Sequence, residues 1–272
     1  MQTINVHPTR PVGHLVREWR QHRRLSQLDL ATHAEISARH LSFVESGRAK
    51  PSREMVLRLA NHLDIPLRER NALLLAAGFA PAYAARPMED ASMTAASRLI
   101  EQLLRGFEPY PALTVDRHWQ LLSSNQATMR LIDGVAPQLL QPPVNVLRLS
   151  LHPNGLAPRL RNLPEWRAHL LHRLQQQIEA TQDPKLVALR SELESLPAPG
   201  GAVVEVQPTA IAVPMRLEVR GQILSMISTT TVFGSPVDIT LSELALEAFV
   251  PADDQTAQAL RQLADDWPKE PP

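Results

Sequence analysis

Residues 25–51 read LSQLDLATHAEISARHLSFVESGRAKP. Ser26 and Ser37 are placed to accept backbone N–H groups at the starts of two short helices, over 27–32 and 38–45. A glycine ends the second helix, and a basic loop follows it. Two short helices joined by a tight turn are typical of a unit that inserts into the major groove of DNA.

The second of these helices has a narrow apolar stripe. Leu41 and Val44 lie three residues apart, and Ile36 precedes them. Such a stripe seats a helix on a small core and leaves its other faces available for contacts. The free faces carry Ala38, Arg39, His40, Ser42 and Phe43.

A longer pattern surrounds the two helices within residues 12–79. It consists of Leu25-Ser26-Gln27, Ala31, Ala34, Ile36-Ser37, Leu41-Ser42, Glu45, Gly47, Pro51-Ser52, Leu57, Leu59-Ala60 and Leu63. This pattern resembles the Xre/lambda-repressor-like helix-turn-helix class, which implies a compact all-α bundle that binds double-stranded DNA. The class usually has glycine where this chain has Glu35, at a turn position that favours a left-handed backbone, so the side chain costs about 1 kcal/mol there.

The resemblance implies contacts between individual residues and DNA. The residues concerned are Gln27, Ser37, Ala38, Arg39, Ser42, Arg48 and Lys50. Gln27 would touch a backbone phosphate, and Arg39 would read a guanine through two hydrogen bonds, with Ser37, Ala38 and Ser42 also facing base edges. Arg48 and Lys50 would touch phosphates and set the register. Ser37 can also be only a helix cap, and Arg48 and Lys50 only solvated charges.

Charge is divided unevenly along the chain, which has 28 Lys+Arg and 28 Asp+Glu in total. Residues 1–80 contain 12 basic and 7 acidic residues, a net charge of +5, and the remainder contains 16 and 21, a net charge of −5. A basic part joined to an acidic one is expected of a DNA-binding module with a regulatory body, although arginines also solubilise helices. Glu45 is expected to be structural, because a carboxylate beside a phosphate would repel it.

Length and composition exclude several kinds of protein. A chain of 272 residues with 44% apolar content suffices for two domains with separate cores. The absence of cysteine excludes disulfides, thiol nucleophiles and cysteine-based zinc sites. Since no apolar run approaches the length of about 18 residues that a membrane span needs, and no signal-peptide pattern is present, we expect a cytoplasmic protein with no membrane partner.

No sequence motif indicates catalysis. The chain has no nucleophile elbow, no phosphate-binding glycine loop and no dinucleotide fingerprint. His169 and His172 have a spacing that can hold a metal on one helix, but no carboxylate or thiol partner is evident, and an exposed helix face is the favoured interpretation. We therefore expect no enzyme, no catalytic residue, no metal site and no cofactor.

Helical patterns and prolines predict where the domains begin and end. Helices over 12–24, 52–63 and 67–77 complete a five-helix DNA-binding domain at residues 10–80. Residues 81–106 form a linker and an amphipathic connecting helix, which can also pack against a second copy. Residues 107–266 form the regulatory domain.

The regulatory domain begins and ends with strands. Strands are expected over 112–116 and 119–122, then a helix to 131 and further helices over 164–181 and 183–196, then strands over 211–219, 222–232 and 243–249. This order predicts an α+β domain with a small antiparallel sheet and helices over one face. Such an arrangement encloses a cavity in PAS-like sensor domains.

A second resemblance covers roughly residues 107–265. The residues that carry it are Tyr110-Pro111-Ala112-Leu113-Thr114-Val115-Asp116 with Trp119, Asn125-Gln126-Ala127, Asn145-Val146-Leu147-Arg148-Leu149, Pro158-Arg159-Leu160 with Trp166, Phe233-Gly234-Ser235-Pro236-Val237-Asp238, and Phe249 with Pro251-Ala252-Asp253. They resemble the MmyB-like ligand-binding domain that is attached to helix-turn-helix regulators in bacteria. The resemblance implies a PAS-like pocket and, in some members, a fatty-acid-like ligand.

Six residues are candidate ligand contacts, namely Trp119, Met129, Leu147, Arg148, His152 and Met215. Ligand cavities are mostly apolar with a few convergent polar groups. Arg148 and His152 lie one helical turn apart, and either can meet a carboxylate. Each apolar candidate can also be an ordinary core residue.

Together these features predict a sequence-specific transcriptional regulator. We expect a homodimer, because one recognition helix reads only a few base pairs. The C-terminal domain is expected to sense a small, largely apolar ligand. The alternative is a constitutive repressor whose C-terminal domain serves dimerisation or protein interaction without an effector.

Overall fold

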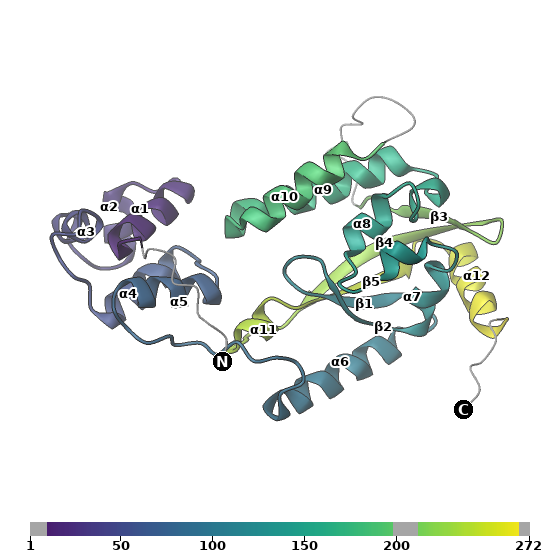
Figure 1. Ribbon diagram of the computed structural model, residues 1–272, viewed down its shortest axis with the longest axis horizontal. Coiled ribbons are helices and arrows are strands. Elements are labelled where there is room, and N and C mark those ends of the chain that lie inside the picture. The colour runs from purple at the N-terminus through teal and green to yellow at the C-terminus, as the bar shows by residue number, and fades with distance from the viewer. Residues whose placement is uncertain (1–9, 198–211, 267–272) are drawn as a thin grey trace. The chain divides into compact units, whose positions relative to one another are not determined.

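The computed structural model describes residues 10–197 and 212–266, and in it the chain forms two compact units (Figure 1). The first unit comprises the described residues up to Arg86 together with Pro236–Ser242, and the second comprises the rest. This division differs from the predicted one in two ways. The helical part of residues 81–106 belongs to the second unit, and a short segment from late in the chain belongs to the first.

The first unit contains a bundle of helices, as the sequence predicts. They are α1 (Val12–His22), α2 (Gln27–His33), α3 (Ala38–Glu45), α4 (Arg53–His62) and α5 (Leu67–Ala76). Ser26, Ser37 and Ser52 each accept a backbone N–H at the start of a helix. The caps predicted at Ser26 and Ser37 are therefore present, and Ser52, expected as the first residue of its helix, caps it instead.

The core of this bundle is formed by fully buried leucines, among them Leu30, Leu41 and Leu59. Helix α1 approaches α3 so closely that a Cβ on Gly13 would lie 2.2 Å from the carbonyl oxygen of Val44. Glycine is therefore required at that crossing. Glu35 has a φ of 53°, which confirms the left-handed turn between α2 and α3.

The late segment Pro236–Ser242 is an integral part of the first unit. It contains the short helix α11 (Ile239–Ser242), which packs against α5. Asp238 is buried and its carboxylate lies 3.1 Å from the guanidinium of Arg86. The N–H of Ile239 donates to the carbonyl of Ala84, and the Ile239 side chain is buried.

The second unit is built on a five-stranded antiparallel sheet in the order β2-β1-β5-β4-β3. Its strands are β1 (Ala112–Val115), β2 (Leu121–Ser124), β3 (Met215–Val219), β4 (Gln222–Val232) and β5 (Ala245–Pro251). The α+β prediction of a small antiparallel sheet with helices is thereby confirmed. The predicted start of β3 at residue 211 lies outside the described residues.

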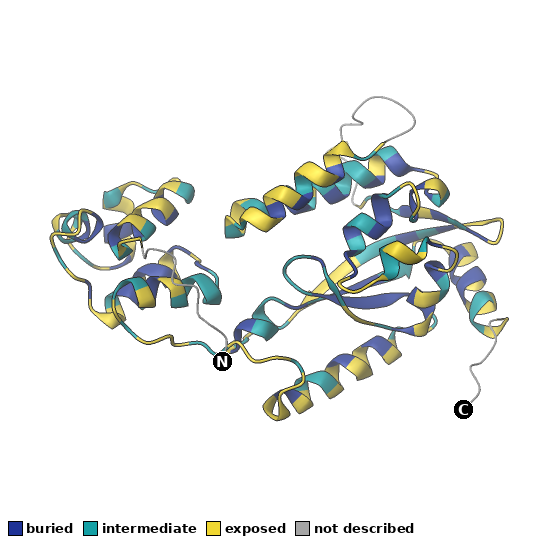
Figure 2. Ribbon diagram, viewed as in Figure 1, coloured by how far each residue is buried: buried dark blue, intermediate teal, exposed yellow. Residues whose placement is uncertain are grey.

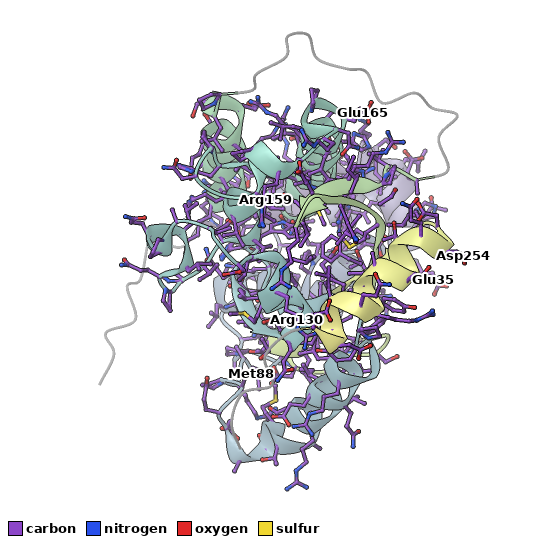
Figure 3. All side chains as sticks on the ribbon, turned by 90° about the vertical axis from the view of Figure 1, so that its right-hand side faces the viewer. Glu35, Met88, Arg130, Arg159, Glu165 and Asp254 are labelled. Atoms are coloured by element: carbon purple, nitrogen blue, oxygen red, sulfur yellow. The ribbon has the colours of Figure 1, made fainter. Side chains whose placement is uncertain are left out.

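The helices of the second unit are α6 (Thr94–Gly106), α7 (Gln126–Leu131), α8 (Val146–Leu151), α9 (Leu163–Thr181), α10 (Pro184–Ser195) and α12 (Asp254–Asp265). Short 3-10 turns occupy Ala91–Met93, Pro137–Leu140 and Ala157–Arg159. Helix α12 begins at Asp254, labelled in Figure 3, and is not among the predicted elements. Its preceding residue, Asp253, caps it by accepting the N–H of Thr256.

Helices pack on both faces of the sheet, where the sequence analysis expects one covered face. Because side chains alternate along a strand, β1 and β5 contribute to two cores. Leu246 and Ala248 pack with Ile100 and Leu104 of α6, and Figure 2 shows α6 with its buried side toward the sheet. The larger core lies on the opposite face, where α8, α9 and α10 pack.

Candidate DNA interface and ligand cavity

Three helices of the first unit meet at one buried carboxylate, that of Glu45. Arg20 of α1 donates from Nε to Oε1 at 2.7 Å and from a terminal nitrogen to Oε2 at 2.8 Å. Gln27 of α2 donates its amide to Oε2 at 2.8 Å. Burial alone would raise the pKa of Glu45, but the hydrogen bonds from Arg20 and Gln27 and the charge on Arg20 lower it. Glu45 therefore stays ionised and has the structural function that the sequence analysis expects.

One amide hydrogen of Gln27 is therefore bonded to Glu45 within the protein. The Gln27 side chain lines a polar notch beside α3 together with Arg17, Ser42 and Ser46.

Arg39 and Arg48 share a contact with one aromatic ring. The guanidinium of Arg39 lies 5.4 Å from the ring centroid of Phe43, and that of Arg48 lies 6.0 Å from the same ring. Such contacts orient an arginine and leave its hydrogen-bonding edge available. Phe43 is half-buried and both arginines are exposed. Phe43 is on the predicted free face of the helix without a predicted DNA contact, and its position four residues after Arg39 is the sequence signal for this ring contact.

The other predicted DNA contacts lie at the start of α3, along α3 and in the following loop. The Ser37 hydroxyl accepts the N–H of His40 at 3.1 Å, so this residue is a cap whatever else it contacts. Ala38 and Ser42 are half-buried, and Lys50 is exposed. All seven predicted residues thus belong to the two short helices and the basic loop that follows them.

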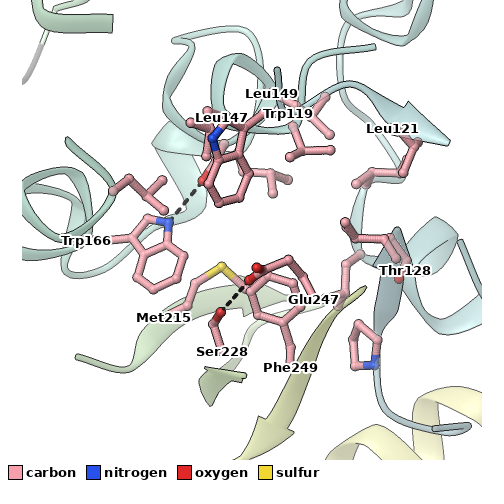
Figure 4. Close-up of a pocket in the computed structure, with 18 of the residues that line it drawn as sticks. Trp119, Leu121, Thr128, Leu147, Leu149, Trp166, Met215, Ser228, Glu247 and Phe249 are labelled. Carbon is pink, nitrogen blue, oxygen red and sulfur yellow. Dashed lines mark hydrogen bonds between the residues drawn. The ribbon is translucent and has the colours of Figure 1, made fainter. Parts of the chain in front are cut away.

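A cavity lies between the sheet and the helices of the second unit (Figure 4). Its wall is largely apolar and includes Trp119, Leu147 and Met215, three of the six candidate ligand contacts. The centres of water-sized molecules can occupy about 80 Å³ of it, and a single water needs roughly 10–15 Å³ of such volume. The cavity therefore has room for several water-sized molecules.

The other three candidates do not line this cavity. Met129 is 53% exposed, because α7 turns Thr128 and Leu131 inward instead. Arg148 pairs with Glu192 through Nε and a second nitrogen at 2.5 and 2.8 Å, which raises the pKa of Arg148.

His152 is occupied at the end of α8, where its Nδ1 accepts the N–H of Asn154 at 3.0 Å. Helix α8 instead turns Val146, Leu147, Leu149 and Ser150 toward the cavity. Arg148 is directed away from it, to Glu192. Neither Arg148 nor His152 therefore belongs to the described wall of this cavity.

The cavity has a polar side that the sequence analysis does not predict. Glu247 of β5 is 3% exposed and lines the cavity. Arg173 of α9 donates to its two carboxylate oxygens at 2.8 and 3.1 Å. Arg173 also lies 5.0 Å from the ring centroid of Trp119, whose Nε1–H donates to Gln177. The sequence signal for this polar side is a charged residue, Glu247, at an inward-facing position of an otherwise apolar strand.

Two family models match the chain. A helix-turn-helix domain matches residues 11–73, and the MmyB-like transcription regulator ligand binding domain matches residues 96–263. The chain belongs to the MmyB-like family. A comparison with curated proteins found no match. This MmyB-like protein is therefore a DNA-binding transcription regulator with a C-terminal ligand-binding domain.

The histidines of α9 are not gathered into a metal site. His169 lies against the Trp166 ring at 5.2 Å, and burial, followed by the charge of Arg173, lowers the pKa of His169. His172 contacts the amide of Gln176. Over residues 10–197 and 212–266, no group of three or more metal-binding side chains occurs. Within the same ranges, no helix is both long and apolar enough to cross a membrane.

Proposed function

We propose that this MmyB-like regulator is a cytoplasmic homodimer that binds a specific operator and responds to a small, largely apolar ligand of fatty-acid-like shape. The matched families are transcription regulator domains, so we infer a non-enzymatic function. In this proposal the cavity is the sensor, as in PAS-like domains, and α3 with its following loop reads the DNA.

The observation that carries the proposal is the path of the chain between β4 and β5. Ser228 of β4 and Glu247 of β5 line the cavity. The segment between these strands, Pro236–Ser242, belongs to the DNA-binding unit and is fastened there by the Asp238–Arg86 ion pair. A ligand that shifts β4 or β5 would therefore pull on the DNA-binding unit through the covalent chain. Regulation requires only that the arrangement of the protein that binds DNA and the one that does not differ in their affinity for the ligand.

On the DNA side, we propose that Arg39 reads a base while Arg48 and Lys50 contact phosphates. Phe43 would hold both arginines in place. Ser37, Ala38 and Ser42 would approach base edges, and Gln27 would support a phosphate at the notch beside α3.

We infer dimerisation from the need to read two half-sites. Leu99 and Leu103 are 44% and 38% exposed on α6 and would suit a contact with a second copy. These exposed leucines also favour the alternative function, in which the C-terminal domain binds a partner and no effector exists. Sedimentation of the full chain, alone and as a Leu103→Glu variant, tests the dimer contact.

Thermal melting separates the sensor from the effector-free alternative. The full chain is melted with a panel of octanol, decanol, dodecanol and their acids and methyl esters. A sensor gains stability with at least one compound, by an amount that grows with ligand concentration. Leu147→Phe fills part of the cavity and should abolish that gain, while Leu122→Phe, on an exposed residue of β2, should preserve it. A wild-type protein that no member of the panel stabilises would contradict the sensor proposal.

A further inference from the structure

The carboxylate of Glu247 has every acceptor position occupied by the protein. Its Oε1 accepts hydrogen bonds from Arg173 at 2.8 Å and from the Thr230 hydroxyl at 2.7 Å. Its Oε2 accepts from Arg173 at 3.1 Å and from the Ser228 hydroxyl at 2.9 Å. A carboxylate has about four lone-pair sites, so Glu247 has none left for a ligand.

The charge of Arg173 is paired with the same anion. It donates to both oxygens of Glu247 and to the Thr230 hydroxyl at 2.9 Å, and it lies over the Trp119 ring. Among the described residues that line the cavity, Arg173 and Glu247 are the charged ones. The described wall of the cavity therefore has no net charge, because its cation and its anion are paired with each other.

One hydroxyl group in the cavity wall can donate a hydrogen bond to a ligand. Ser150 of α8 is 8% exposed and its oxygen accepts the indole N–H of Trp166 at 3.0 Å, as Figure 4 shows by a dashed line. In the part of the chain that the structure describes, no acceptor takes the hydrogen of this hydroxyl. A neutral ligand oxygen placed there would gain one hydrogen bond without disturbing the ion pair.

From these contacts we propose that the cavity selects an uncharged lipid-like ligand, such as an alkyl alcohol or ester, over a carboxylate of the same length. The proposal rests on the sensor function and specifies the head group of its ligand. It differs from the fatty acid that the family resemblance implies.

The physical reason for this selectivity is the cost of placing a third charge in the cavity beside Arg173 and Glu247. A ligand carboxylate needs a cation, and among the described residues of the cavity wall Arg173 alone can supply one. Taking Arg173 would leave Glu247 as a buried anion without its partner, and leaving Arg173 in place would bury the ligand anion unpaired. An alcohol or ester avoids both costs and gains the same apolar contacts along its chain.

The test is calorimetric titration of the full chain with decanol, methyl decanoate and decanoate at neutral pH. We expect decanol or methyl decanoate to bind at least about tenfold more tightly than decanoate. Decanoate binding as tightly as the neutral compounds, or more tightly, would overturn the head-group proposal and leave the sensor function intact. If none of the three compounds binds, and none of their octyl and dodecyl homologues binds either, both the sensor function and the head-group proposal are overturned.

A charge variant adds a second readout. Glu247→Gln keeps the shape of the side chain and leaves Arg173 without an anion, so decanoate should bind this variant more tightly than it binds the wild type, by about tenfold or more. Glu192→Gln is the matched control, because it removes the anion of the Arg148 pair outside the cavity and should leave the preference unchanged. If Glu247→Gln does not fold, the wild-type comparison decides alone. A folded Glu247→Gln protein that still rejects decanoate would contradict the proposal.

Discussion

Arg20 of α1 and Glu45 of α3 form a two-bonded ion pair in which both side chains are at least nine-tenths buried. The pair joins the first helix to the recognition helix, and Gln27 joins α2 to the same carboxylate. The orientation of α3 therefore depends on one buried charge and not only on the apolar stripe beneath it. Because an unpaired charge is costly to bury, removing either Arg20 or Glu45 should lower the stability of the DNA-binding unit strongly.

Arg20→Met should destabilise the DNA-binding unit by about 3–5 kcal/mol, because it leaves Glu45 buried without its cation. Urea unfolding, followed by hydrogen exchange of the α1 and α3 amides in the full chain, measures the change. Arg10→Met is the matched control, since the Arg10–Glu18 pair is exposed and is worth at most about 1 kcal/mol. If the two substitutions lowered the unfolding free energy equally, the buried pair would stabilise the protein no more than the exposed pair does.

Acid should weaken the same unit through Glu45. The pKa of Glu45 is lower in the folded protein than in the unfolded chain, where it is about 4.3, so its contribution is fully present above that pH. The contribution is lost as the pH falls through the folded pKa. Stability of α3 amides against exchange should thus fall below about pH 4 more steeply in the wild type than in Glu45→Gln. Parallel pH profiles of the two proteins would contradict the assignment.

Gly13→Ala should prevent the normal packing of α1 on α3. The new Cβ would lie 2.2 Å from a backbone carbonyl oxygen, which cannot move without moving the helix. We expect a loss of about 3 kcal/mol or more in unfolding free energy, at or above the upper range for overpacking. Gly106→Ala, where nothing lies within 4 Å of the new Cβ, should change stability little. A stable Gly13→Ala protein with normal DNA affinity would show that the crossing is wider than described.

Arg39→Ala and Lys50→Ala should weaken DNA binding in different ways. Arg39→Ala should relax the preference at one base pair and cost about 1–3 kcal/mol on the preferred operator. Lys50→Ala should weaken binding to all sequences alike and reduce the dependence of affinity on salt by about one counterion. Selection from a random DNA library followed by titrations at several salt concentrations provides both readouts. Uniform weakening by Arg39→Ala would make Arg39 a phosphate contact, and an unchanged salt slope would remove Lys50 from the interface.

The helices of the first unit could be predicted because their signals are local. A serine at each start and a stripe of leucines three or four residues apart determine where α2 and α3 begin and how they pack. The function of Glu45 followed from the same reasoning, since a carboxylate on a DNA-binding face is out of place unless it is paired.

The cavity was only partly predictable, because its polar side depends on residues far apart in the chain. Arg173 and Glu247 are 74 positions apart, and no local pattern pairs them. Arg86 and Asp238, which fasten the late segment to the first unit, are 152 positions apart. Met129 and Arg148 lie outside the cavity wall for a different reason: the sequence indicates a helix but not which of its faces the sheet covers.

A ligand in the cavity should change the affinity of the first unit for DNA through Pro236–Ser242. The most direct measurement is the Kd of the full chain for its selected operator with and without a saturating cavity ligand, with binding of that ligand established by calorimetry. We predict a change of about 5- to 150-fold, and a smaller change in Asp238→Asn, which weakens the attachment to Arg86. An operator Kd that stays the same while the ligand is bound would contradict the account.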